Sequence, residues 1–169
     1  MESIFKARSI FEWRDEWLLG IPTLDDQHRV LAGCLNRLVS ECAELHGSDG
    51  DDNEIAVRKE AMARLVDDLY NRSRKHFGVE EEMMLDHAYP GYEHHRREHV
   101  MLLAELKSTF AAPLKDGCCN MKPEVLRALK SWFIVHVASS DREFAQWMSD
   151  RGLSAALPGV REKTGKPLY

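Results

Sequence analysis

Eight histidines are the residues of this 169-residue chain with the clearest capacity for metal chemistry. Five of them recur on the same helical faces as the apolar residues, at steps of three or four: His28, His76, His95, His99 and His136. A single histidine on such a face is usually an ordinary core residue. Five would each need a partner for a second ring nitrogen, and an unpaired buried polar group costs about 1–3 kcal/mol. One shared metal centre satisfies all five.

The spacing within two segments is typical of chelation. His95 and His99 are four residues apart, so both imidazoles lie on one helix face and can bind the same ion. His76 and Glu80 repeat this spacing with a carboxylate as the second ligand. Two further helical segments contribute one histidine each, His28 and His136.

Asp141 is the second candidate carboxylate, and its position is unusual. It follows His136 by five residues, which on an ideal α-helix turns the two side chains about 140° apart. For both to reach one centre, the backbone between them must widen. The sequence therefore predicts a local distortion of the helix between His136 and Asp141.

The number of candidate ligands indicates two metal ions. Imidazole and carboxylate together suit iron, zinc or copper, and five histidines with two carboxylates are too many for one ion. Two ions bridged by Glu80, Asp141 and a solvent-derived oxygen use the whole set. Three histidines then make one ion six-coordinate, and two leave the other five-coordinate. The open position could bind a small diatomic molecule.

The remaining histidines and the cysteines have simpler interpretations. His46 and His87 fall at expected helix ends, where a cation complements the helix dipole, and His94 lies off the apolar stripe. The adjacent Cys118 and Cys119 could form a redox pair or a soft-metal site. Two free loop thiols are favoured, because neither has a CxxC partner.

The positions of the turn-forming residues predict the fold. These residues interrupt the chain at 20–22, 47–53, 89–91, 113–123 and Gly152. Between these breaks the apolar spacing is helical, with no sustained strand-like alternation. The sequence predicts an all-α, up-down-up-down antiparallel four-helix bundle over residues 24–151. Residues 1–23, rich in Phe and Trp, are expected to form an N-terminal arm packed on the bundle, and residues 152–169 a C-terminal tail.

Composition narrows the class of protein. The net charge of −5 disfavours nucleic acid as a partner, since phosphate binding needs a basic face. No apolar run reaches the ~18 to 20 residues needed to cross a bilayer, so no membrane association is expected. The first twenty residues are too charged for a signal peptide. We therefore expect a cytoplasmic protein.

These motifs together resemble the hemerythrin family, in particular the bacterial hemerythrins, over residues 11–150. The resemblance is carried by Trp13 and Asp15, by Gly20-Ile21-Pro22-Thr23-Leu24-Asp25-Asp26-Gln27-His28, by His76-Phe77-Gly78-Val79-Glu80-Glu81, by Tyr89-Pro90 with His95 and His99, and by Trp132 with His136 and Asp141. Seven ligand positions in the right order, with their flanking residues, make this a specific signal.

The resemblance implies a non-haem di-iron centre that binds dioxygen reversibly, for storage or delivery, and not an enzyme. Two iron ions, alternating between Fe2+ and Fe3+, would share an oxo or hydroxo bridge. The implied roles are six-coordinate iron on His95, His99 and His136, five-coordinate iron on His28 and His76, and bridging carboxylates from Glu80 and Asp141. Dioxygen would occupy the open position.

Apolar walls should shield such a ligand from water. The candidates are Leu31, Trp132 and Phe133, which lie within one turn of His28 or His136, although plain core packing explains them equally well. Leu24 and Phe133 depart from the isoleucine and leucine that the family pattern favours. These departures predict a slightly altered pocket shape.

Three other functions remain open. The first is an oxygen-sensing or redox-sensing module that signals to a protein partner, which the residues do not identify. The second is a di-iron enzyme acting on peroxide or nitric oxide. The third is a zinc-stabilised bundle, which would be colourless, unlike a di-iron protein.

Overall fold

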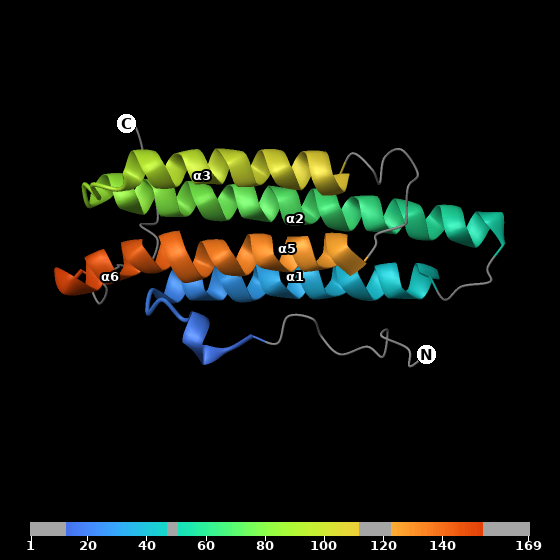
Figure 1. Cartoon of the computed structure of the whole chain (residues 1–169), viewed down its shortest axis with the longest axis horizontal. Helices are drawn as coiled ribbons and strands as arrows, with labels where there is room; N and C mark the ends of the chain where they lie inside the picture. The colour runs from blue at the N-terminus through green and yellow to red at the C-terminus, as the bar shows by residue number, and fades with distance from the viewer. Residues whose placement is uncertain (1–12, 47–50, 112–122, 154–169) are drawn as a thin grey trace, which may run out of the picture.

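The computed structural model describes residues 13–46, 51–111 and 123–153. Its long helices are α1 (Pro22–His46), α2 (Asp52–Asp86), α3 (Tyr92–Glu105), α5 (Pro123–His136) and α6 (Arg142–Asp150). Figure 1 shows successive rods running in opposite directions, with α6 continuing α5. α1 packs against α2 and α5, and α2 packs against α3. The described residues contain no strand, so the predicted all-α four-helix bundle is confirmed.

The helices begin and end near the breaks that the sequence predicted, at a polar cap or at a residue with a positive φ. The Asp51 carboxylate accepts hydrogen bonds from the backbone N–H groups of Asn53 and Glu54, at 3.0 and 2.9 Å, and so caps α2. After α2 the chain turns at Ala88, which has a φ of 55°. Gly152 follows α6 with a φ of 69°, a conformation that glycine adopts without strain.

Two π-helices widen the rods. η2 (Leu106–Ala111) continues α3, and η3 (Val137–Asp141) joins α5 to α6. η3 fills the interval between His136 and Asp141, so the predicted distortion of this helix is confirmed. The sequence did not predict η2.

The segment before α1 is tied to the bundle by a buried carboxylate. It contains a short 3-10 helix, η1 (Asp15–Trp17), and buries Trp17 in the core. The Asp25 carboxylate accepts hydrogen bonds from the backbone N–H groups of Leu19 and Gly20, at 2.8 and 3.1 Å. Other predictions lie outside the described residues, namely those for residues 1–12 of the arm, for Cys118 and Cys119, and for residues 154–169 of the tail.

Two apolar clusters flank the middle of the bundle. On α1, Leu24 belongs to one cluster and Leu31 to the other, with His28 between them. On the fourth rod, Phe133 and Phe144 are divided between the clusters in the same way. The candidate ligands therefore form a polar layer enclosed on both sides by close-packed apolar side chains.

Candidate metal centre

The structure brings all seven candidate ligands together in this layer, in two overlapping groups. Within each group the ligand atoms lie within 4.8 Å of one another. The first group is Glu80, His95, His99, His136 and Asp141, and the second is His28, His76, Glu80 and Asp141. Glu80 and Asp141 belong to both. We call these the three-histidine group and the two-histidine group.

Asp141 lies between the two groups with one oxygen toward each. Its Oδ1 is 3.1 Å from Nε2 of His95 and 3.0 Å from Nε2 of His136. Its Oδ2 is 3.2 Å from Nε2 of His28. The widened backbone of η3 gives Asp141 this position, since it returns a side chain five residues after His136 to the same face.

Glu80 contacts both groups from α2. Its Oε2 is 3.3 Å from Nε2 of His99 and 3.9 Å from Nε2 of His95, in the three-histidine group. The same oxygen is 3.6 Å from Nε2 of His76, one helical turn earlier. The Nε2 atom of His76 is in turn 2.9 Å from Nε2 of His28. A set of ring nitrogens and carboxylate oxygens thus converges on one small volume.

Several of these atoms have no hydrogen-bond partner among the described residues, although all seven side chains are buried. They are both carboxylate oxygens of Glu80, Oδ2 of Asp141, and Nε2 of His99 and His136. Each such atom costs about 1–3 kcal/mol when left unsatisfied. Cations among them would satisfy all of them, and a nitrogen and oxygen donor set is one that iron accepts. The residues present therefore fit a pair of metal ions.

Burial also sets the protonation states that metal binding requires. Burial, helped by the neighbouring His28, lowers the pKa of His76 to about 3. Burial and then His95 lower the pKa of His99 to about 2. Both rings are therefore neutral at pH 7, with a lone pair free for a metal.

The two carboxyl groups have opposite shifts. Burial raises the pKa of Glu80 well above its usual value, and the charge of Asp141 adds to this effect. Burial also opposes ionisation of Asp141, but the nearby His136 and the hydrogen bond from His95 to Oδ1 at 3.1 Å hold its pKa well below the usual value. In the metal-free centre burial thus favours the neutral form of Glu80, whereas the surrounding histidines favour the ionised form of Asp141.

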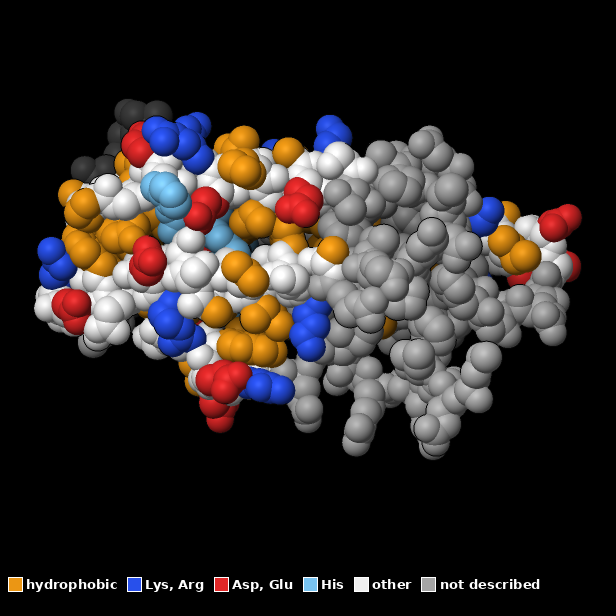
Figure 2. Space-filling model, in the orientation of Figure 1, with side chains coloured by type: hydrophobic (Ala, Val, Ile, Leu, Met, Phe, Trp, Pro, Cys, Tyr) orange, Lys and Arg blue, Asp and Glu red, His pale blue; other side chains and the backbone are white. Residues whose placement is uncertain are grey.

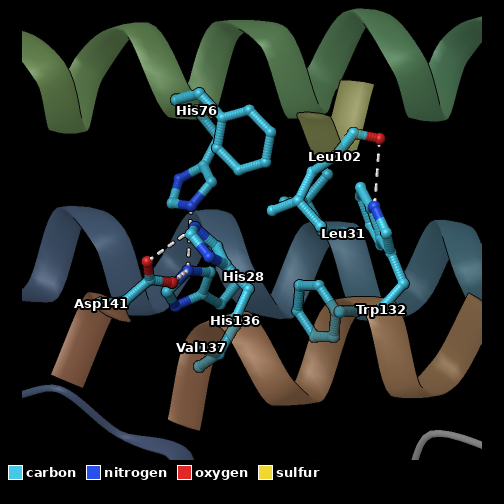
Figure 3. Close-up of a pocket in the computed structure, with 10 residues that line it drawn as sticks. His28, Leu31, His76, Leu102, Trp132, His136, Val137 and Asp141 are labelled. Atoms are coloured by element: carbon cyan, nitrogen blue, oxygen red, sulfur yellow. Dashed lines mark hydrogen bonds and ion pairs between the residues drawn. The ribbon is translucent and has the colours of Figure 1, made fainter. Parts of the chain in front are cut away.

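A small cavity adjoins the two-histidine group (Figure 3). It has a volume of about 10 Å³, on the scale that holds one molecule of the size of water. It is bordered by both histidines of that group, His28 and His76, and by Asp141. Of the three-histidine group's own histidines, only His136 borders it. Its remaining walls are apolar: Leu31, Phe77, Leu102, Trp132, Phe133 and Val137.

The structure places the three predicted wall residues, Leu31, Trp132 and Phe133, around this cavity. Leu102 was not predicted as a wall residue, and its backbone oxygen accepts a hydrogen bond from Nε1 of Trp132 at 3.1 Å. Leu102 lies on the same apolar stripe as His99, so the periodicity contained the signal.

Leu102, Trp132 and His136 line both this cavity and a surface hollow of about 470 Å³ between α3 and α5. Figure 2 shows histidine side chains reaching this face among acidic and hydrophobic neighbours.

His87 and His94, which were not predicted as ligands, belong to neither group. The side chain of His94 is 80% exposed, and His87 caps the end of α2. His46 ends α1, and its side chain lies outside the described part of the chain.

Comparison with known proteins decides the family. A model of the family described as hemerythrin HHE cation binding domain matches residues 19–148 of the chain. The chain belongs to the hemerythrin family. The matched hemerythrin domain contains all seven candidate ligands, and the resemblance predicted from the sequence is confirmed.

The individual relatives are distant. A bacteriohemerythrin of Stenotrophomonas maltophilia is 25% identical over 81% of this chain and 80% of its own length. One of Clostridium acetobutylicum is 25% identical over 80% of this chain and 98% of its own length. A hemerythrin from Sipunculus nudus is 31% identical over 84% of this chain and 97% of its own length. These hemerythrins match the bundle along most of its length.

Proposed function

We propose that this protein binds dioxygen reversibly at a pair of iron ions, for storage or delivery. His95, His99 and His136 would hold one ion, and His28 and His76 the other, with Glu80 and Asp141 shared between them. The proposal is supported by the family and by the two overlapping ligand groups. When bound, the iron pair supplies a coordination position for dioxygen and the electrons that dioxygen accepts.

The position of the cavity is the observation that carries this proposal. The group with fewer protein ligands is also the group that has free space beside it. An exogenous ligand needs both an open coordination position and room to occupy it. A cavity of about 10 Å³ favours a molecule of two or three atoms over an organic substrate.

The protein's own residues supply the conditions for reversible binding. The neutral rings of His76 and His99 can coordinate without first losing a proton. The apolar walls formed by Leu31, Trp132 and Phe133 offer water no hydrogen-bond partner in the space beside His28, which disfavours its entry. Exclusion of water protects a bound molecule from displacement and from side reactions. These features favour a carrier over an enzyme, because a bound molecule that is protected from side reactions is released unchanged.

An optical experiment tests the proposal. The full chain is loaded anaerobically with ferrous iron, exposed to dioxygen, and then returned to an oxygen-free atmosphere. We expect a visible chromophore that appears with dioxygen and disappears on its removal over repeated cycles. Irreversible oxidation in the first cycle, or steady consumption of peroxide or nitric oxide with added reductant, would overturn the carrier function. A zinc-loaded sample is the colourless control.

We also propose a cellular location and a set of partners for this protein. No helix in the described ranges is long and apolar enough to cross a membrane. We expect a cytoplasmic protein whose ligand is dioxygen, without a nucleic-acid partner. A sensing role would require a change of structure between the oxygen-free and oxygenated forms, which small-angle scattering of the two forms would detect.

A further inference from the structure

The outward-facing ring nitrogens of three candidate ligands have side-chain partners. Nδ1 of His76 lies 2.8 Å from Oε1 of Gln27, to which it donates a hydrogen bond. Nδ1 of His99 donates in the same way to Oε1 of Glu81, at 2.9 Å. In each case the partner fixes the ring so that Nε2 points into the centre.

His136 has a looser contact of the same kind. Its Nδ1 lies 3.7 Å from Oε2 of Glu98, which is too far for a direct hydrogen bond but close enough for the charge of the carboxylate to act on the ring. Each partner comes from the helix that precedes the ligand along the chain: Gln27 on α1 faces α2, Glu81 on α2 faces α3, and Glu98 on α3 faces α5. Each is also the sequence neighbour of a candidate ligand on its own helix, next to His28, Glu80 and His99 respectively. Each of these three helices therefore supplies a ligand and places a polar side chain beside a ligand on the next helix.

The chemistry of the partners differs between the two groups. The partner in the two-histidine group, Gln27, is a neutral amide. The partners in the three-histidine group, Glu81 and Glu98, are carboxylates, and their side chains are only 25% and 31% exposed. Both carboxylates are held in place: Nε of Arg96 lies 3.9 Å from Glu81, and the Ser140 hydroxyl donates to Glu98.

A carboxylate that accepts the Nδ1–H of an imidazole makes Nε2 a stronger donor to a metal, and it does so more than an amide. We propose that Gln27, Glu81 and Glu98 are positioning residues, and that the two carboxylates make the three-histidine position bind metal more tightly and stabilise its ferric state. This inference rests on the proposed iron pair. The two metal positions would then differ both in the number of their ligands and in the residues that contact those ligands from outside the centre.

The first test uses cobalt(II), whose binding does not depend on dioxygen chemistry. The metal-free full chain is titrated at pH 8, with binding followed by absorption and calorimetry. Glu81→Gln keeps the size of the side chain and removes its charge, so we expect one of two binding steps to weaken about 10–100-fold. Glu82→Gln, an exposed neighbour on the same helix, should leave both steps unchanged.

The second test separates charge from a merely structural role. In the iron-loaded protein we expect Glu81→Gln to raise the reduction potential of one ion, and Gln27→Glu to lower that of the other. Damage to the fold would not produce shifts of opposite sign. Potentials that stay in place, or that move together, would overturn this inference. Failure of the unaltered chain to bind two cobalt ions would instead overturn the proposed function.

Discussion

His136 and Asp141 face the same point although they are five residues apart, with Nε2 of His136 3.0 Å from Oδ1 of Asp141. A regular α-helix would turn them about 140° from each other. The π-helix between them, Val137–Asp141, removes this difference. The distortion thus has a direct consequence for the centre, because it places a carboxylate where both ligand groups can share it.

Asp141→Asn should weaken metal binding at both positions. The substitution keeps the shape of the side chain, but it removes the charge that faces His95 and His136 through one oxygen and His28 through the other. We expect an affinity loss larger than the roughly 10–100-fold that follows the loss of an outer partner. Iron per chain after desalting, measured by mass spectrometry, checks this. Asp86→Asn, at an exposed position on α2, is the control, and full iron content in Asp141→Asn would refute the shared role.

His76→Ala should affect one position only, since His76 belongs to the two-histidine group alone. We expect one of the two ions to be lost, together with the reversible chromophore, while the three-histidine position keeps its metal. His94→Ala is the matched control, because that side chain is 80% exposed and lies outside both groups. Loss of metal in His94→Ala, or an unchanged spectrum in His76→Ala, would show that the wrong histidines had been assigned.

Trp132→Phe tests the wall of the cavity. The change keeps an aromatic ring but removes the hydrogen bond from Nε1 to the backbone oxygen of Leu102. We expect a loss of about 1 kcal/mol in the free energy of unfolding. Freer entry of water should also make the oxygenated form decay faster, which the fading of its chromophore measures. Trp147→Phe alters the other apolar cluster and should leave the decay unchanged.

The metal-free protein should lose stability as the pH falls from 6.5 to 4.5. The pKa values of His76 and His99, about 3 and about 2, lie below the usual value of about 6.5, so below pH 6.5 the unfolded chain binds protons that the folded chain does not. Glu80, whose pKa is raised, acts in the opposite direction over this range.

Each of the two histidines lowers the free energy of unfolding by about 2 kcal/mol over this range, and Glu80 offsets part of that sum. Urea unfolding of the metal-free chain at the two pH values measures this difference. Stability that is constant or increases toward pH 4.5 would show that the rings of His76 and His99 are not held neutral by the fold.

The sequence predicted those parts of the site that depend on position along one helix. His95 with His99, and His76 with Glu80, are paired by a spacing of four residues, which fixes them on one face whatever the rest of the chain does. The distortion before Asp141 followed from the same geometry. The helical bundle itself followed from the continuous stripes between turn signals.

Contacts between helices outside the seven ligands and the three wall residues were not predicted. The side chains of Gln27, Glu81 and Glu98 look like ordinary polar surface residues in the sequence, and only the packing of neighbouring helices directs each toward a ligand ring. The hydrogen bond from Trp132 to Leu102 joins residues 30 positions apart. The π-helix Leu106–Ala111 has no signal in the residue spacing that we can identify.

Anomalous X-ray diffraction from crystals of the iron-loaded protein, recorded at the iron absorption edge, tests the central claim most directly. We expect two separate iron peaks, one bound by His95, His99 and His136 and the other by His28 and His76, with Glu80 and Asp141 between them. A single peak, or iron bound away from these seven side chains, would contradict the di-iron centre.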